Sequence, residues 1–482
     1  MQSIFGIKAH LCKSATIMFS AGQSFSDLLK FKMAYYRNSL RTLPVEILVF
    51  ICEFMCPHCV ETIYMGDQTS LARLCLASRL FRDIAQPVLF HFYGGSHGLL
   101  RHRILQAVSQ RPNLAASMRI LNLTEDRSNN RTMMLKNEDA QFFEDLAAHL
   151  EFNTEPGWTR LSSSLYEGNE QDYLECIEET TADMLITCLP NLEQLALQWD
   201  QYRSLASLTY VLQQGQWDGL PFLKYLQLDH WDTEGCFNAS TVRGLLRATP
   251  NIETLSMQMC SFYEPNANAE GSSVERFPIL RKLKRIELSQ CSISPSGLAT
   301  LESFLASCPT MEQFDFVAGL GETRWAMPRD VIRTLLTCST TLRGLSLDYR
   351  GIGPDVPMRS QIKTLRGFSC LENISVDMDL FCTYYAYDFD RFHETRSHDD
   401  DCLRKLLPQS IKTVQLLSNE IRGPCEQDMY QLGYECLKGG FPHLKLVSIS
   451  RAPEEFSDIP APLLELFNSA GVELEHLLDS LE

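Results

Sequence analysis

The sequence has no apolar run long enough to cross a membrane. A spanning helix needs about 18 uncharged residues in succession, and the longest candidate is an interrupted stretch at residues 47–55. Positive charge is also scarce, because 43 Lys and Arg stand against 60 Asp and Glu, which leaves a net charge of −17. Such a surface repels nucleic-acid phosphates and anionic lipid headgroups. We therefore expect neither a membrane nor a nucleic acid as a partner.

Motifs of catalysis are missing too. The chain contains no Walker loop, no G-x-S-x-G elbow and no H-E-x-x-H pair. The acidic cluster at residues 398–401 is more typical of a solvated loop than of a metal site. With 45% hydrophobic and 21% charged residues, the composition is that of an ordinary folded protein. We expect a protein that is not an enzyme and that needs no cofactor and no metal ion.

The 17 cysteines lack the features of a secreted disulfide scaffold. Their number is odd, they are scattered along the chain, and no secretory signal peptide precedes them. Residues 1–26 contain no acidic residue, yet they lack the Arg-rich amphipathic helix of a transit peptide. These features predict a reducing compartment, cytoplasmic or nuclear, and a disordered leader over residues 1–38.

What the sequence does contain is a repeat. Nine segments carry apolar residues at positions 1, 4 and 6 of a short motif, and the first residues of successive segments stand 28 to 40 residues apart, as in a solenoid. An earlier copy, Met118/Leu121/Leu123, fits the frame but begins 74 residues before Leu192. The nine triplets are Leu192/Leu195/Leu197, Leu223/Leu226/Leu228, Ile252/Leu255/Met257, Leu283/Ile286/Leu288, Met311/Phe314/Phe316, Leu342/Leu345/Leu347, Leu371/Ile374/Val376, Ile411/Val414/Leu416 and Leu444/Val447/Ile449.

The spacing inside each segment predicts a short strand. Positions 4 and 6 of a strand point to the same side, so they enter a core that neighbouring repeats share. Between the strands, residues 296–308 and 328–338 space their apolar residues three and four apart, as an amphipathic helix does. A proline stands two residues before five of the triplets, where it stops the helix and favours extended chain. These prolines are Pro190, Pro221, Pro250, Pro309 and Pro442.

This motif resembles the leucine-rich repeat, whose longer variants pair each strand with a full helix. The ninth position of that repeat is usually Asn or Cys, and here only Cys260, Cys291 and Asn419 match, which predicts irregular turns. For the two cysteines a buried structural role is favoured over a catalytic one. The resemblance implies an α/β fold over residues 93–482, a solenoid with parallel strands on its concave face and helices on its convex face. Loop insertions are expected near 125–140, 153–171 and 383–401.

Ahead of the repeats, residues 39–92 resemble the F-box, a small all-α domain. Pro44 in the first turn of the first helix costs no hydrogen bond, and Ile47, Leu48 and Ile51 form an apolar stripe. Three short helices cannot hide this much apolar surface, so part of it is available to a partner. The matched residues are Leu43, Pro44, Glu46, Ile47, Leu48, Ile51, Leu71, Leu74, Leu76, Ser78, Arg79, Phe81 and Ile84.

Together the two resemblances identify the chain as similar to F-box/leucine-rich-repeat proteins of the fungal type. They imply that the F-box binds a Skp-type adaptor, and through it the cullin and RING subunits of a ubiquitin ligase, while the repeats hold an unknown protein substrate. The alternative is a leucine-rich-repeat interaction scaffold whose helices only cap the array, with no ligase role. The adaptor-binding residues implied are Leu43, Pro44, Ile47, Leu48, Ile51, Leu71, Leu74 and Phe81.

The segment Cys56, Pro57, His58 and Cys59 interrupts the expected helices. It matches the active-site pattern of periplasmic thiol oxidases, but that chemistry requires a βαβ unit around the motif, and here helices are expected on both sides. Zinc binding by Cys52, Cys56, His58 and Cys59 is a second alternative, although no other Cys/His pair stands at a suitable spacing. A solvent-facing loop is the favoured interpretation.

Strand positions 3, 5 and 7 point away from the core and line the concave face. Their acidic residues outnumber their single base, Arg285, whereas a receptor for phosphorylated segments needs clustered arginines. We therefore expect a basic or neutral substrate that is recognised without phosphorylation. Aromatics in the 383–401 insertion either bind the substrate or pack that loop onto the solenoid. The substrate-binding candidates are Tyr225, Asp229, Glu287, Asp315, Asp348, Asp377 and Tyr385.

Overall fold

The computed structural model describes residues 43–59, 68–94, 98–124, 142, 145–146, 148–150, 181–198, 217–230, 236–263, 276–319, 326–350, 361–381, 401–417, 423–451 and 459–478. The expected leader at 1–38, the insertions near 125–140, 153–171 and 383–401 (save Asp401), and Tyr385 lie outside these residues. The chain divides into two compact units, Met1–Phe92 and Tyr93–Glu482.

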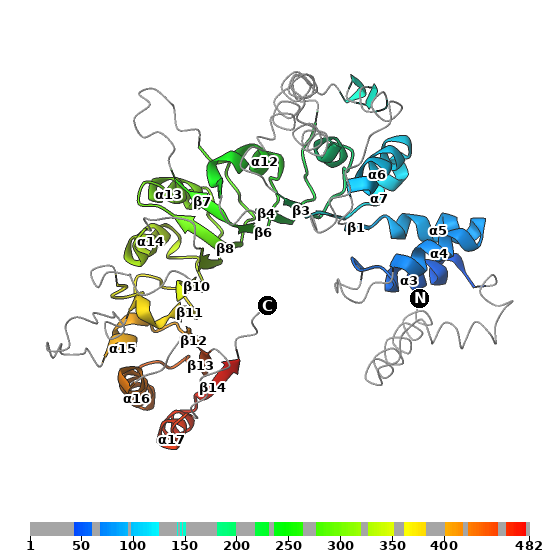
Figure 1. Ribbon diagram of the computed structural model, residues 1–482. Helices are drawn as coiled ribbons and strands as arrows, with labels where there is room; N and C mark the ends of the chain where they lie inside the picture. Colours follow the sequence, from blue (N-terminus) through cyan, green and yellow to red (C-terminus); the bar gives the residue numbers. More distant parts are fainter. Residues whose placement is uncertain are drawn as a thin grey trace, which may run out of the picture. The chain divides into compact units, whose positions relative to one another are not determined.

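The first unit is helical in its described part. It contains α3 (Val45–Phe54), α4 (Gln68–Ala77) and α5 (Arg79–Leu89) (Figure 1). Pro44 precedes α3, where its fixed φ of −53° suits a helix start. Ser78 begins α5 by accepting a hydrogen bond from the Phe81 amide at 3.2 Å. The buried core that holds the three helices together consists of Leu48, Cys52, Met55, Cys56, Leu71, Cys75, Ile84, Ala85 and Val88.

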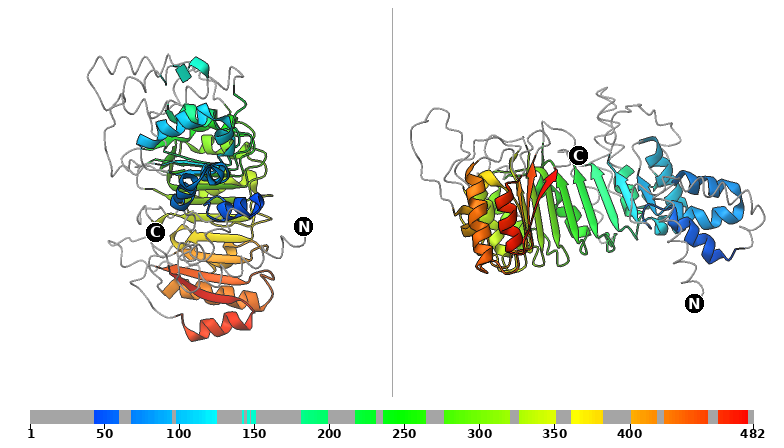
Figure 2. Two further views of the ribbon diagram at one scale, coloured as in Figure 1. Left: turned by 90° about the vertical axis from the view of Figure 1, so that its right-hand side faces the viewer. Right: turned by 90° about the horizontal axis from the view of Figure 1, so that it is seen from below.

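The second unit is built on an open, parallel sheet, and its strands point the same way (Figure 2). Fourteen strands are joined in the described part of the chain, and the main path from β2 onward follows chain order. The strands of the main path are β1 (Phe92–Gly94), β2 (Ile120–Leu123), β3 (Gln194–Gln198), β4 (Tyr225–Asp229), β6 (Thr254–Gln258), β8 (Arg285–Ile293), β9 (Gln313–Ala318), β10 (Gly344–Asp348), β11 (Asn373–Asp377), β12 (Thr413–Leu417), β13 (Leu446–Arg451) and β14 (Glu473–Leu478).

The register of this sheet confirms the predicted frame. Position 4 of each triplet lies opposite position 4 of the next, as Leu195 lies opposite Leu226 and Phe314 opposite Leu345. All 27 triplet side chains are buried, none of them more than 5% exposed. The early copy belongs to the same array, because Leu121 lies opposite Leu195. Stacked in this way, the repeats share one continuous apolar core.

Helices alternate with the strands and lie on the outer side of the strand array within this unit (Figure 1). The helices expected at 296–308 and 328–338 are confirmed as α13 (Leu298–Ala306) and α14 (Pro328–Leu335). None of the helices that the structure describes has both the length and the apolarity that a membrane crossing requires. Besides α13 and α14, the described helices of this unit are α6 (Gly98–Gln110), α7 (Pro112–Ser117), α12 (Arg243–Ala248), α15 (Cys402–Leu406), α16 (Gly423–Leu437) and α17 (Ala461–Ser469), with 3-10 turns η3 (Ala239–Val242), η4 (Leu336–Cys338) and η7 (Met378–Leu380).

A four-residue turn leads into seven of the nine triplet strands. In the turn at residues 220–223 the Leu223 amide donates to the Leu220 carbonyl at 3.2 Å, and Pro221 takes the second place, where a β-turn favours its fixed φ. The side chain of Asn251, in the next such turn, donates to the Pro221 carbonyl at 2.7 Å and so links two repeats. The predicted order of helix, proline and strand is confirmed, but the proline shapes a turn and not extended chain.

The ninth positions confirm a structural role for the two cysteines. Cys291 is fully buried, its sulfur accepts the Cys260 amide at 3.3 Å, and its thiol donates to the Met257 carbonyl at 3.3 Å. Met259 and Gln290, one residue earlier in each repeat, have left-handed φ angles of 54° and 52°, which turn the chain sharply after β6 and within β8. A second short ladder, β5 (Phe237–Asn238) with β7 (Cys260–Phe262), follows these corners and was not foreseen.

Position 4 should carry much of the stability of the repeats. Replacing Phe314 by alanine is expected to lower the free energy of unfolding by about 3–5 kcal/mol, because the ring is fully buried and its removal leaves a cavity. The matched control is Val317→Ala on the same strand, whose side chain is 38% exposed and should cost little. Urea unfolding followed by circular dichroism measures both, and equal midpoints for the two variants would contradict the assignment of Phe314 to the core.

Candidate functional site

Three large apolar side chains stand out on the helical unit because they are exposed. Leu76 is 81% exposed, Val45 50% and Leu80 45%. Leu76 and Leu80 flank the junction at which α4 ends and α5 begins. That junction is held by the Arg82 guanidinium, which donates to the Cys75 carbonyl at 3.3 Å, and by the Ser78 cap. A rigid junction therefore presents two leucines to solvent.

The residues matched to the F-box fall into two groups. Leu48 and Leu71 lie in the core, 3% and 0% exposed, so they hold the helices together and offer no side chain to a partner. Pro44 is exposed. The remaining adaptor candidates are half-buried, and they are Leu43, Ile47, Ile51, Leu74 and Phe81. All of them except Ile47 are recorded as packing against the core. The sequence indicated Leu80 as part of an apolar set but predicted neither Val45 nor Leu80 as adaptor-binding, because exposure depends on how the helices pack.

On the repeat unit, positions 3, 5 and 7 form rows that cross the sheet, as the frame predicted. Glu287 on β8 lies opposite Asp315 on β9, and Tyr225 belongs to a row that continues to Arg285 through Thr254. The side chains of Asp229, Glu287, Asp315 and Asp348 are all half-exposed on this surface, and we call these four residues the acidic face.

Arginines already pair with much of the acidic face. Arg285 contacts Glu287 at 2.7 Å and Asp315 at 3.1 Å. Arg350 makes a two-pronged contact with Asp348, at 3.1 Å from Nε and 2.8 Å from the terminal nitrogen. Burial raises the pKa of Asp315, although the nearby Arg285 opposes this shift. The face is therefore acidic in composition but partly neutralised by its own side chains.

Asp377 differs from the other acidic candidates because it is buried, only 3% exposed. Its Oδ1 accepts the Asp379 amide at 3.1 Å and caps η7. Burial, followed by repulsion from Asp379 and Asp348, raises the pKa of this carboxyl to about 7, while the Asp379 amide and Arg350 oppose the shift. Asp377 therefore stabilises the end of β11 and does not line the exposed surface.

The raised pKa of Asp377 predicts a pH-dependent stability. A carboxyl whose pKa is higher in the folded chain than in the unfolded chain stabilises the fold fully at low pH, and that contribution is lost as the pH rises from about 4 through about 7. Asp377→Asn keeps an oxygen for the cap and removes the charge. We expect thermal unfolding from pH 4 to pH 8 to show that the free energy of unfolding of this variant, relative to that of the parent chain, increases by a few kcal/mol as the pH rises. A difference that stays constant with pH would contradict the assignment.

A cluster of sulfur and imidazole side chains lies in the helical unit. Cys56, His58 and Cys59 follow the end of α3, and His91 stands two residues beyond α5. Their potential ligand atoms all lie within 4.8 Å of one another. Cys52, which the sequence suggested as the fourth ligand, is buried in α3 and lies outside the cluster. His91 is the fourth member of the cluster instead. The sequence pattern did not indicate it, because it is a single histidine far from the motif and not part of a Cys/His pair.

The pKa values of the two cysteines of the cluster shift in opposite directions. The thiol of Cys59 lowers the pKa of Cys56 to about 4, with His91 and the backbone amides of Cys59 and His58 acting the same way against the effect of burial. The pKa of Cys59 is raised in turn, first by Cys56 and then by burial. The expectation of a solvent-facing loop is wrong for Cys56 and Pro57, which are both buried.

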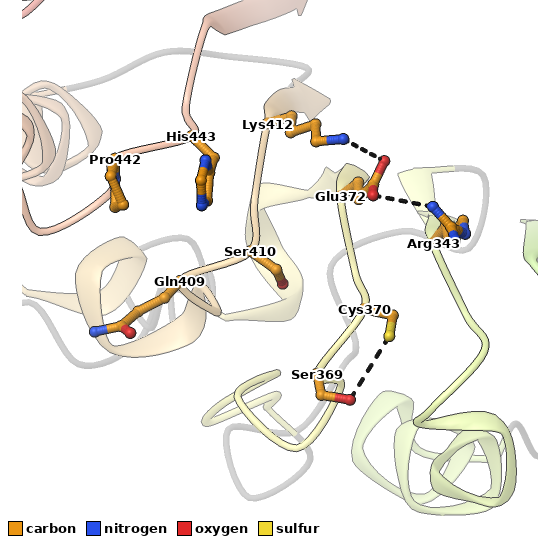
Figure 3. A pocket seen from close by; sticks show the side chains of 9 residues that line it. All are labelled: Arg343, Ser369, Cys370, Glu372, Gln409, Ser410, Lys412, Pro442 and His443. Carbon is orange, nitrogen blue, oxygen red and sulfur yellow. Dashed lines mark hydrogen bonds and ion pairs between the residues drawn. The ribbon is translucent and has the colours of Figure 1, made fainter.

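A shallow hollow of about 430 Å³ lies where successive turns enter β10 to β13 (Figure 3). Glu372 sits between two bases there, 3.1 Å from Arg343 and 2.8 Å from Lys412. These are surface ion pairs of small energy. The residue after the first triplet position alternates in sign over the first eight triplets, and in the ninth Lys445 repeats the charge of Lys412. The alternating series is Glu193, Lys224, Glu253, Lys284, Glu312, Arg343, Glu372 and Lys412.

The comparisons with known proteins add no relative: no protein-family model matches the chain, and a search of the curated proteins finds no match.

Proposed function

We propose that this chain is the substrate-recognition subunit of a Skp-cullin-F-box ubiquitin ligase. In this proposal the helical unit is an F-box that binds the Skp-type adaptor, and the parallel array is a leucine-rich-repeat domain that binds a protein substrate. The observation that carries the proposal is the pairing of two features in one chain. A three-helix unit with exposed leucines comes first, and a parallel repeat sheet follows it.

The exposed side chains of the helical unit support an adaptor interface. Val45, Leu76 and Leu80 leave apolar surface in water, which costs about 25 cal/mol for each Å² that a partner could cover. Pro44 and the half-buried Ile47 and Ile51 lie on α3 or at its start and extend the available surface. Apolar anchors surrounded by polar residues are typical of protein interfaces.

The acidic face supports the second half of the proposal. Arg285 and Arg350 are engaged with carboxylates, so neither is available to grip a phosphate bidentately without breaking an ion pair. A basic or neutral protein segment, by contrast, meets carboxylate oxygens along several strands. In this proposal the substrate is recognised without phosphorylation, catalysis resides in the partner subunits, and the complex works in the cytoplasm or nucleus.

Adaptor binding is expected to depend on Leu76. Leu76→Asp should weaken co-purification of the full chain with a Skp-type adaptor by about tenfold or more, because a charge would replace an apolar anchor. The side chain is 81% exposed, so the fold should be unaffected. Leu43→Ala with Pro44→Ala should act in the same direction.

The matched control is Phe222→Asp, since Phe222 is an exposed ring, 55% accessible, on the repeat unit. It should leave adaptor binding unchanged. If the parent chain fails to bind the adaptor, the ligase role is wrong and the alternative of a repeat scaffold without a ligase role gains support. Equal binding by the Leu76 and Phe222 variants would place the interface elsewhere.

Substrate capture is expected to depend on the acidic face. Asp315→Lys combined with Asp348→Lys should reduce ubiquitination of captured proteins several-fold, because both changes reverse charge on neighbouring strands. Glu312→Lys is the control, since this exposed residue lies just ahead of β9, outside the rows of the acidic face. Phosphatase treatment of the substrate pool should have no effect. Capture that requires phosphorylation would contradict the proposed recognition.

A further inference from the structure

The cluster in the helical unit has the dimensions of a tetrahedral metal site. Zinc takes sulfur at about 2.3 Å and imidazole nitrogen at about 2.0–2.1 Å, which sets tetrahedral ligand atoms roughly 3.3–3.8 Å apart. Here the Cys59 sulfur lies 3.6 Å from Nδ1 of His58 and 3.4 Å from Nδ1 of His91. All four ligand atoms fall within 4.8 Å of one another, so small side-chain rotations complete the tetrahedron.

The ligand chemistry selects zinc. Two thiolates and two neutral imidazoles balance the charge of a divalent cation, which suits a place where Cys56 is 1% exposed. Cysteine binds metal as the thiolate, so zinc would displace the thiol protons when it binds.

The position of the cluster gives the metal a structural task. Cys56, His58 and Cys59 follow the end of α3, and His91 follows the end of α5, 32 residues after Cys59. A metal at this point joins the ends of two helices that, in the described part of the unit, share a small core. Small domains with limited cores commonly rely on a metal or on disulfides for stability.

The rival chemistry of the Cys56-Pro57-His58-Cys59 segment is thiol-disulfide exchange. A redox cysteine of that kind gains its reactivity at the start of a helix, where the helix dipole favours a thiolate. Here Cys56 follows the C-terminal end of α3, where the dipole has the opposite sign. In addition, His91 approaches Cys59 from the segment just beyond α5, a contact that a dithiol pair does not need.

We propose that Cys56, His58, Cys59 and His91 bind one zinc ion that links the end of α3 to the end of α5. The site is structural, with all four positions of the tetrahedron taken by the chain. It does not depend on adaptor binding, so it can be tested whether or not the ligase role holds.

The test measures metal in the full chain, purified from a reducing cytoplasm without chelator. Elemental analysis should find one zinc ion per chain, and removal of the metal followed by cobalt addition should produce the visible absorption of tetrahedral cobalt with sulfur ligands. His91→Ala and Cys59→Ser should each bring zinc occupancy close to zero. Cys52→Ala is the matched control, because Cys52 is a nearby buried cysteine outside the cluster and its variant should keep the metal.

Retention of zinc by the His91 and Cys59 variants would overturn the proposal, as would loss of zinc from the Cys52 variant alone. A parent chain that takes up neither zinc nor cobalt would also overturn it, and a Cys56-Cys59 disulfide in such a chain would favour redox chemistry. The cobalt spectrum of the unaltered chain provides a result even where a variant fails to fold.

Discussion

The repeat unit depends on one recurring backbone contact. In each repeat the carbonyl just ahead of the strand accepts two amides from the next repeat, as the Glu193 carbonyl accepts Lys224 and Tyr225 at 2.8 and 3.2 Å. The Lys224 carbonyl then accepts Glu253 and Thr254, and the contact recurs as far as Lys445 and Glu473. It sets the register, and because the register is kept over the triplet positions, positions 4 and 6 face the core; the one-residue shift between β8 and β9 comes after Leu288, beyond the triplet. The rows of polar side chains on the opposite surface follow from the same register.

Much of this architecture could be predicted because burial in a repeat leaves a local signature. An apolar residue at every second position is visible in the sequence, and the φ angle of a proline is restricted by its own ring, independently of contacts with distant residues. The last described strand, β14, was not predicted because its six residues Glu473–Leu478 carry two glutamates and a histidine, which obscure the apolar pattern. The second ladder at β5 and β7 was not predicted, because strands of two and three residues are too short to show a periodic pattern.

Candidate sites were harder to predict because they depend on distances between elements. His91 contacts Cys59 although the two are 32 residues apart, and no motif in the sequence around either residue indicates the contact. Asp377 stands in an exposed frame position, yet the 3-10 turn after it buries the carboxyl. Leu76 and Leu48 have similar chemistry and lie in neighbouring helices, but helix packing exposes one and buries the other. Pattern predicts which residues are apolar, whereas packing decides which of them a partner can touch.

The alternation of charge at the entrance to the strands constrains how this array can change in length. Each acid there stands next to bases of the adjacent repeats, as Glu372 does between Arg343 and Lys412. Loss of a single repeat among the first eight would bring two like charges together, as Lys412 and Lys445 already stand at the end of the series, whereas loss of two neighbouring repeats would preserve the alternation. Each such mismatch costs only a fraction of a kcal/mol on an exposed surface, but gain or loss in pairs avoids a further one. The fold can be lengthened or shortened by one repeat at a time, but the charge alternation is kept only when repeats are gained or lost two at a time.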